Sequence, residues 1–258
     1  MNGNRRVKLF ALPDIPEVRD GDDVGSLIIA AMDRLGEPWR RGDILVVAQK
    51  IVSKAEGQCQ RLADVVPGPR ALEIGALCGK DPRKVQLILD ESAEIVRVAR
   101  SGTAGLVIAR HRQGWVCANA GLDESNLSSE DCLLRLPRAP DASARKIADT
   151  IEAMRDIRPG VIITDTFGRP WRHGLVNVAI GLNGLPAIID LTGTNDAYGR
   201  KLKVSQQAFA DEIAAASGML MVKDAALPAV VVRGLAWNAV PNASAGQYVR
   251  SVEEDLFR

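Results

Sequence analysis

The chain has 258 residues, 47% of them hydrophobic and 25% charged, which is typical of a globular protein with a full core in one large domain or two smaller ones. Lys and Arg (33) nearly balance Asp and Glu (32), so a net charge of +1 gives no support to a general nucleic-acid-binding surface. No apolar run is long enough for a membrane span, and MNGNRRVKLFALPD does not resemble a signal peptide, so we expect a cytoplasmic protein without membrane or nucleic-acid partners.

The first half of the chain predicts strands and amphipathic helices. Residues 7–12 form an apolar strand that Pro13 ends, and residues 23–35 repeat apolar side chains at helical spacing. Residues 44–48 predict a strand buried on both faces. Residues 69–98 are expected to be mainly helical.

The second half adds a hairpin, helices and further strands. Residues 105–109 and 115–118 are expected to pair around a polar turn that contains an exposed His111. Further elements are expected at residues 141–154 (a helix capped by Asp141 or Ser143), 161–164 (strand), 187–191 (strand), 205–217 (helix) and 229–232 (strand). Because strands and helices mix without strict βαβ alternation, the predicted fold class is α+β.

The cysteines have no metal-binding pattern. Cys59, Cys78, Cys117 and Cys132 show neither CxxC nor Cys/His spacing. We expect all of them to be reduced and structural, as in a cytosolic protein. Nothing in the sequence marks any of them as a nucleophile.

QKIVSKAEG, residues 49–57, follows the buried strand. On a helix Lys50 and Lys54 would share a face with Ser53 beside them, and two ammonium groups with a hydroxyl suit phosphate oxygens. The glycines of a Walker A loop are absent. The alternative interpretation is a solvated basic turn.

GLDESN, residues 121–126, is rich in turn-forming residues. Asp123 offers a hard carboxylate oxygen to Mg²⁺ or Mn²⁺, and Asn126 offers a carbonyl or an amide donor. The alternative interpretation is an ordinary Asx turn without a ligand.

VIITDTFGRPWRHG, residues 161–174, changes abruptly from apolar to charged. Asp165 and Thr166 form a plausible ligand pair for a hard cation at the end of a strand. Arg169, Arg172 and His173 follow, and their charge suits the phosphate or carboxylate of a small anionic ligand. In the alternative interpretation Asp165 pairs structurally with Arg169.

Other catalytic signatures are absent from the sequence. The chain has no GxSxG nucleophile elbow and no HExxH helix, and DTFGR lacks the second aspartate of a DxDxT phosphatase loop. With 2 histidines, a metal site of several histidines is excluded.

Taken in order, VVAQKIVSKAEG, AGLDESN, VIITDTFGRPWRHG and AVVVRG resemble the coenzyme F420-0:γ-glutamyl ligase family, from LPDIPEVRDGDD onward. The resemblance implies a GTP-dependent ligase that adds L-glutamate to the lactyl-phosphate tail of a deazaflavin precursor, with Mg²⁺ or Mn²⁺ and with stimulation by K⁺. It also implies an α+β fold in which residues 1–258 form one domain of two subdomains, and an intertwined homodimer.

The same resemblance implies roles for individual residues. Nucleotide contacts are implied for Leu12, Pro13, Asp14, Ile15, Gln49, Lys50, Lys54 and Asn126. Metal ligands are implied for Asp123, Asp165 and Thr166, in agreement with their hard oxygen donors. We expect Asp165, Lys54 and Arg169 to act in catalysis, and Arg169 and Arg172 to bind an acidic group of the substrate.

The expected chemistry activates a carboxylate before an amide forms. The γ-phosphoryl group of GTP passes to the acceptor carboxylate, and the glutamate amine then displaces phosphate from the acyl phosphate. Phosphoryl transfer depends on positioning and on neutralising charge, which suits a site of Asp, Thr, Lys and Arg without a protein nucleophile.

This chain departs from the family pattern at two places. Gln49 stands where a Ser or Thr usually precedes the first lysine, and Val222–Lys223 stand where a glycine and a polar residue near the metal are usual. A protonated Lys223 cannot bind a metal, so we expect it to offset phosphate charge. The departures leave open a ligase that acts on another acidic cofactor precursor. A non-catalytic nucleotide-binding homologue would be expected to lose Asp123 and Asp165, and both are present.

Overall fold

The computed structural model describes residues 6–101, 104–125, 131–222 and 224–255. The helices are α1 (Val24–Leu35), α2 (Gln49–Ala55), α3 (Pro69–Cys78), α4 (Pro82–Glu91), α5 (Pro140–Arg155) and α6 (Phe209–Ser217), with 3₁₀ turns η1 (Leu62–Asp64), η2 (Asn119–Gly121) and η3 (Ala245–Tyr248). The strands are β1 (Lys8–Ala11), β2 (Ile44–Ala48), β3 (Cys59–Arg61), β4 (Ser92–Ser101), β5 (Ala104–His111), β6 (Val116–Ala118), β7 (Cys132–Leu134), β8 (Gly160–Arg169), β9 (Arg172–Asn183), β10 (Ile189–Asp190), β11 (Gln206–Gln207) and β12 (Ala229–Arg233). The fold class is α+β, as predicted. No helix in the described ranges is long and apolar enough to cross a bilayer.

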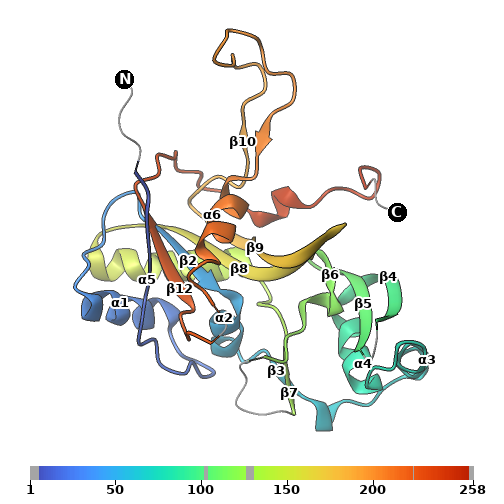
Figure 1. Ribbon diagram of the computed structural model, residues 1–258. Coiled ribbons are helices and arrows are strands. Elements are labelled where there is room, and N and C mark those ends of the chain that lie inside the picture. The colour runs from blue at the N-terminus through green and yellow to red at the C-terminus, as the bar shows by residue number, and fades with distance from the viewer. Residues whose placement is uncertain (1–5, 102–103, 126–130, 223, 256–258) are drawn as a thin grey trace.

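A mixed five-stranded sheet in the order β1-β12-β2-β8-β9 forms the centre of the molecule (Figure 1). β2 is parallel to β8, while β12 is antiparallel to both β1 and β2. Helices α1 and α5 pack together on one face, and α6 covers the other. Because helices cover both faces, Ile44–Val47 of β2 are fully buried, which confirms that prediction.

A smaller lobe extends from this sheet between β3 and β7, and it contains α3, α4 and the sheet β4-β5-β6. Its core is separate from the large one. β5 alternates, with Val107 and Ala109 buried in the lobe core and Leu106 and Ile108 on the opposite face. The paired strands β3 and β7 therefore form the neck through which the chain enters and leaves the lobe.

A disulfide joins Cys59 and Cys132 across this neck. The expectation that all cysteines are reduced was wrong for this pair, because the pairing of β3 with β7 brings residues 73 positions apart in sequence side by side. Cys78 and Cys117 are free and buried, as expected of structural cysteines.

The helix expected at residues 205–217 begins only at Phe209, because Gln206 and Gln207 form strand β11. The other helix predictions were confirmed, with two corrections. Asp23 caps α1, since its carboxylate accepts from the Ser26 amide at 2.6 Å. Neither expected residue caps α5, whose N-cap is Ala139. The Asp141 carboxylate instead accepts from the Leu182 amide at 2.7 Å and so fixes α5 to β9. The second correction concerns residues 92–98, which belong to strand β4 and not to a helix.

Three strand predictions also needed correction. β8 does not end at the acidic pair but continues to Arg169, and the Gly/Pro cluster forms the turn into the long strand β9. His111 ends β5 and is only 3% exposed, because its ring packs beside Glu91. The strand expected at residues 187–191 is reduced to β10. In the first two cases pairing with the neighbouring strand, β9 or β4, decided the structure.

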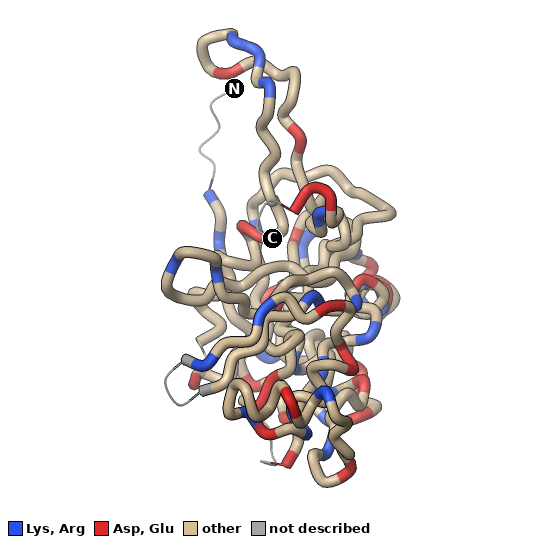
Figure 2. Tube along the Cα trace, turned by 90° about the vertical axis from the view of Figure 1, so that its right-hand side faces the viewer, with Lys and Arg blue, Asp and Glu red and all other residues tan. Residues whose placement is uncertain are grey.

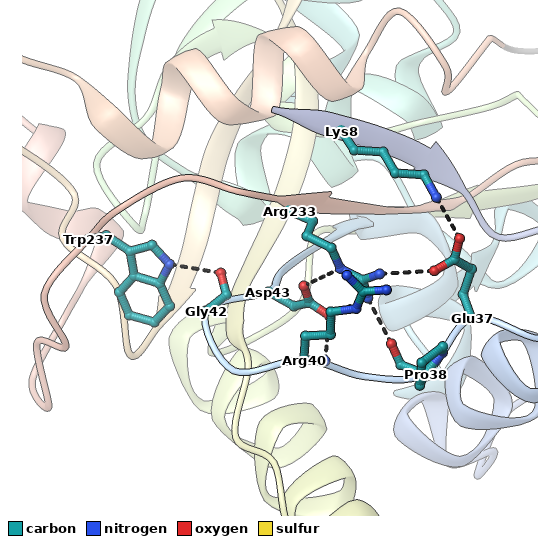
Figure 3. Close-up of polar contacts among 8 residues, drawn as sticks. All are labelled: Lys8, Glu37, Pro38, Arg40, Gly42, Asp43, Arg233 and Trp237. Atoms are coloured by element: carbon teal, nitrogen blue, oxygen red, sulfur yellow. Dashed lines mark hydrogen bonds and ion pairs between the residues drawn. The ribbon is translucent and has the colours of Figure 1, made fainter. Parts of the chain in front are cut away.

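A polar cluster closes one end of the large sheet (Figure 3). Arg233, at the end of β12, donates to both carboxylate oxygens of the fully buried Asp43 at 2.8 Å. It also donates to Glu37 at 2.9 Å and to the carbonyl of Pro38 at 2.8 Å. Lys8 of β1 donates to the other oxygen of Glu37. We call these residues the Arg233 cluster; it ties β1, β12 and the start of β2 together.

The segment around β10 and β11 projects away from the body as a long arm, and Figures 1 and 2 show this from two sides. Beyond the short β10-β11 pair, the chain is held by a bridge between Asn195 and Lys201. Basic residues lie near its tip, and Tyr198 and Val204 are 91% and 88% exposed.

Candidate functional site

A cavity of about 1410 Å³ lies between the large sheet and the small lobe. The carboxyl end of β2 and helix α2 form one wall, β8 and β9 form a second, and the small lobe forms a third. Its polar lining includes Gln49, Lys50, Lys54, Asp123 and Asp165. Three segments that are far apart in sequence therefore meet here, as their chemistry suggested.

Helix α2 supplies two lysines, each with an acidic partner. The Lys50 ammonium lies 2.8 Å from the Asp123 carboxylate and donates to the Ser125 carbonyl at 3.0 Å. The Lys54 ammonium lies 2.6 Å from Glu17. The two lysine side chains are only 20% and 15% exposed, so the interpretation as a solvated basic turn was wrong.

Asp123 is held by a local turn. Its Oδ1 accepts from the backbone amide of Ser125 at 2.8 Å and from the Ser125 hydroxyl at 2.9 Å. Burial raises the pKa of Asp123, but the bonds from Lys50 and Ser125 together outweigh it and hold the pKa below its usual range. Asp123 is thus a preformed carboxylate, with an Asx turn fixing its direction.

Asp165 lies in the opposite electrostatic environment. Burial, with a further contribution from the charge of Asp123, raises the pKa of Asp165 to about 7, although the Thr166 amide donates to its carboxylate. Burial and the Asp165 charge likewise raise the pKa of the Cys117 thiol to about 12. Cys117 is therefore a neutral thiol at physiological pH and not a nucleophile.

The neighbouring carboxylates of Asp123 and Asp165, with Lys50 close to both, suit a divalent cation. Within the described residues no three His, Cys, Asp or Glu side chains gather as a metal site. Asp123 and Asp165 would leave the remaining positions to water and phosphate oxygens, as Mg²⁺ usually does. The side chain of Gln49 is buried beside them, and its hydrogen bond to the Asp165 carboxylate lowers the pKa of Asp165.

Comparison with known proteins shows the family of this chain. The sequence profile of the family described as F420-0:Gamma-glutamyl ligase matches residues 14–234. The chain belongs to this family. It is 43% identical over 254 residues to the coenzyme F420:L-glutamate ligase of Methanothermobacter thermautotrophicus, covering 98% of this chain and 99% of that protein. The enzymes of the same name from Archaeoglobus fulgidus and Methanocaldococcus jannaschii are 41% and 39% identical, with 98% of this chain covered in each case and 97% and 98% of those proteins.

The metal ligands carried over from the F420-0:γ-glutamyl ligase family are only partly brought together. Asp165 lies near Asp123, Lys50 and Gln49. Thr166, the next residue on the strand, lines the cavity, but its hydroxyl donates to the Asn177 side chain on β9 at 3.0 Å. Successive strand residues point to opposite sides, so the side chains of Asp165 and Thr166 diverge. A metal role for either remains a prediction.

The basic cluster of the family motif is divided by the β8-β9 turn. Arg169 lines the cavity, and its guanidinium donates to the His173 carbonyl at 2.6 Å rather than to Asp165. Its Nε is buried without a partner. Arg172 and His173 are exposed and do not line the cavity. Arg169 is therefore the member of this cluster that is placed to meet a substrate.

The N-terminal segment of the family pattern contributes less than expected. Leu12 is fully buried in the large core, and Asp14 is exposed with its carbonyl bound by Arg34. Ile15 and the following residues line the cavity, whereas Pro13 does not. Two further predicted contacts, Asn126 and Lys223, lie outside the described residues.

Sequence reasoning missed several residues that line the cavity. Glu17, the partner of Lys54, lies within the quoted LPDIPEVRDGDD segment, where no role was predicted for it. Asn119 and Arg97 come from the small lobe, which no motif connected to the site. Trp171 was inside the quoted motif, and its position between two arginines at a turn was the available signal.

Proposed function

We propose that this protein is a GTP-dependent ligase that joins L-glutamate to the carboxylate of the deazaflavin precursor F420-0 by a γ-glutamyl amide bond, in coenzyme F420 biosynthesis. The observation that carries the proposal is the convergence of Lys50, Lys54, Asp123 and Asp165 on one cavity in a chain of this family. The names of the relatives support the acceptor and the amino acid. The choice of GTP rests on the resemblance of the motifs.

The reaction needs an activated carboxylate, because a free carboxylate does not react with an amine at a useful rate. In the proposed route the acceptor carboxylate attacks the γ-phosphorus of GTP and GDP leaves. The amine of glutamate then attacks the carbonyl carbon of the acyl phosphate, the C–O bond to phosphate breaks, and the amine loses a proton. The products are the amide, GDP and inorganic phosphate.

The side chains of the site would position these groups and neutralise their charge. Lys50 and Lys54 would exchange their acidic partners for phosphate oxygens, and Arg169 would meet a carboxylate or phosphate of the acceptor or glutamate. Mg²⁺ or Mn²⁺ held by Asp123 and Asp165 would add the positive charge that the phosphate oxygens require.

We further propose that the protein is a homodimer and that the arm around β10 and β11 takes part in its interface. Tyr198 and Val204 are apolar or aromatic side chains almost fully exposed on that arm, which is too thin to have a core of its own. Analytical ultracentrifugation of the protein and of a Tyr198→Ser/Val204→Ser variant tests this. A wild-type monomer would contradict it.

We also propose that K⁺ stimulates the ligase reaction, which is tested by replacing K⁺ with Na⁺ in the assay.

The deciding experiment is mass spectrometry of the product formed from F420-0, GTP and L-glutamate. The expected product is heavier by one or more glutamate residues, and GDP appears only when both acceptor and glutamate are present. Release of GDP without acceptor would favour a phosphohydrolase. Turnover with a different acidic cofactor precursor, but not with F420-0, would favour the alternative ligase that the departures at Gln49 and Lys223 leave open.

A further inference from the structure

The large cavity has two chemically different parts. Its inner part contains the lysines and carboxylates described above. Its outer part lies between the β8-β9 hairpin and the small lobe and is mainly apolar, with Phe167 and Trp171 from the hairpin and Leu106, Ile108 and Val116 from the lobe. The acid and base chemistry of the reaction needs none of these apolar side chains.

Trp171 lies at the tip of the β8-β9 hairpin, where its exposure and its backbone conformation both lower the stability of the fold. It is 81% exposed and has a φ of 57°, a left-handed conformation that is unfavourable for a bulky side chain by roughly 1 kcal/mol or more. Trp171 contributes no buried side chain to the fold, so its exposure on the cavity wall points to a ligand.

The opposite wall comes from the small lobe and is apolar for a geometric reason. Val107 and Ala109 of β5 fill the lobe core, so alternation turns Leu106 and Ile108 toward the cavity. Val116 on β6 lies on the same wall and is 45% exposed. Two sheets thus present exposed apolar side chains to one space.

We propose that this outer part binds the planar fused-ring system of the acceptor, with Trp171 stacked on one face of the ring and the β5-β6 wall against the other. This inference rests on the proposed function and adds to it the residues that select the acceptor. A flat aromatic ring suits a space between two apolar walls, because stacking on tryptophan combines burial with a favourable ring geometry.

The arrangement also matches the shape of such an acceptor. Trp171 follows Asp165 by six residues along β8 and its turn, a separation of up to about 20 Å at the rise of a strand. A ring bound at the hairpin tip would therefore be joined to the reacting carboxylate by an extended polar tail. Arg97 of β4 and Arg169 of β8 line the cavity and offer charge to a phosphate in that tail.

The test is a binding titration with the ring-bearing precursor, without GTP and glutamate, followed by steady-state kinetics. Trp171→Ala is expected to raise the acceptor Kd and KM by about tenfold to a hundredfold, while the KM for GTP and glutamate changes less than about twofold. Trp171→Phe should recover most of the affinity. Leu72→Ala, which removes a 51% exposed leucine from α3 away from the cavity, is the matched control and should bind as wild type does.

Tryptophan fluorescence provides a second readout. Trp39 and Trp115 are buried, and the half-buried Trp237 is bonded to the Gly42 carbonyl and does not line the cavity. Quenching of the exposed Trp171 should therefore dominate the signal on acceptor binding and disappear in Trp171→Phe. Val116→Asp tests the other wall and should weaken acceptor binding as well. If Val116→Asp binds as wild type does, the ring does not lie between the two walls and the proposal is overturned.

Failure of this proposal can be told apart from failure of the proposed function. Amide formation with equal acceptor affinity in wild type and Trp171→Ala overturns the ring site and leaves the ligase intact. Acceptor binding that depends on Trp171, without amide formation under any condition, supports the ring site and contradicts the ligase. A Trp171→Ala variant that loses dimerisation but keeps acceptor affinity would assign this surface to a second copy of the chain and overturn the proposal.

Discussion

The two ends of the large sheet both carry buried charge, yet they differ in how completely that charge is paired. At one end Arg233 makes hydrogen bonds to Asp43, Glu37 and the Pro38 carbonyl, so donors and acceptors are matched (Figure 3). At the other end burial and the charge of Asp123 raise the pKa of Asp165 to about 7, and hydrogen bonds from Thr166 and Gln49 do not offset this rise.

This difference separates a structural cluster from a functional site. Buried charge alone does not identify a site, since Asp43 in the Arg233 cluster is fully buried. What marks the cavity end is charge left without compensation, because a folded chain tolerates that cost where a ligand later provides the missing partner. Each prediction below compares a residue from one end with a residue from the other or with a neutral control.

The largest effect is expected from Asp165→Ala. We expect turnover with F420-0, GTP and glutamate to fall by about a thousandfold or more, because charge at the transferring phosphate is no longer balanced, while the fold is retained. Product formation by mass spectrometry and circular dichroism measure the two parts. Asp149→Ala, at an exposed position on α5, is the control. Undiminished turnover in Asp165→Ala would remove it from the metal site.

Asp43→Ala should lower stability and spare turnover, which is the reverse of the pattern expected for Asp165→Ala. It leaves the Arg233 guanidinium without its main partner, so the free energy of unfolding should fall by about 3 to 5 kcal/mol. Turnover per folded molecule should stay near wild type. Chemical denaturation monitored by fluorescence gives the free energy. A stable but inactive Asp43→Ala protein would contradict the division between the two ends.

Lys54→Ala should weaken GTP binding by about tenfold to a hundredfold and leave the KM for glutamate almost unchanged, since a phosphate oxygen loses one charged donor. Lys8→Ala removes a more exposed lysine of the Arg233 cluster and should alter neither constant. Equal losses for GTP and glutamate in Lys54→Ala would argue against a phosphate contact.

The smallest effect concerns pH. The folded pKa of Asp165 is about 7, above its value in the unfolded chain, so the folded state holds a proton that the unfolded state has already lost. This lowers stability progressively from about pH 4 to pH 7, and the loss is complete above pH 7. In chelated protein, Asp165→Asn should therefore be more stable than wild type by about 1 to 2 kcal/mol at pH 8 and equally stable at pH 4. Thermal melts across this range provide the check, and equal melting temperatures at pH 8 would contradict it.

Local signals in the sequence were sufficient for elements that depend on local interactions. The apolar stripe predicted α1, and the uniform apolar run predicted the buried strand β2. The spacing of Lys50 and Lys54 suited the helix that α2 forms, and the hard oxygen donors suggested Asp123 and Asp165 as members of a site.

Contacts between separate segments of the chain could not be predicted from such local signals. Residues 165–169 alternate weakly in polarity, and only their partner β9 makes them a strand. His111 is polar in a segment that looks like a turn, yet strand pairing with β4 and contact with Glu91 bury it. The partners of the two lysines come from different segments, so no spacing rule connects Lys54 to Glu17.

The position of β12 has a consequence for how the chain is made. Strand β1 pairs only with β12 in the sheet, and β12 also separates it from β2. During synthesis β2, β8 and β9 are complete before β12 leaves the ribosome, whereas β1 waits for residues more than two hundred positions later. Strand β1 is therefore synthesised first but is among the last strands to pair. A nascent chain that stops before Arg233 would leave the edges of both β1 and β2 unpaired and prone to aggregation.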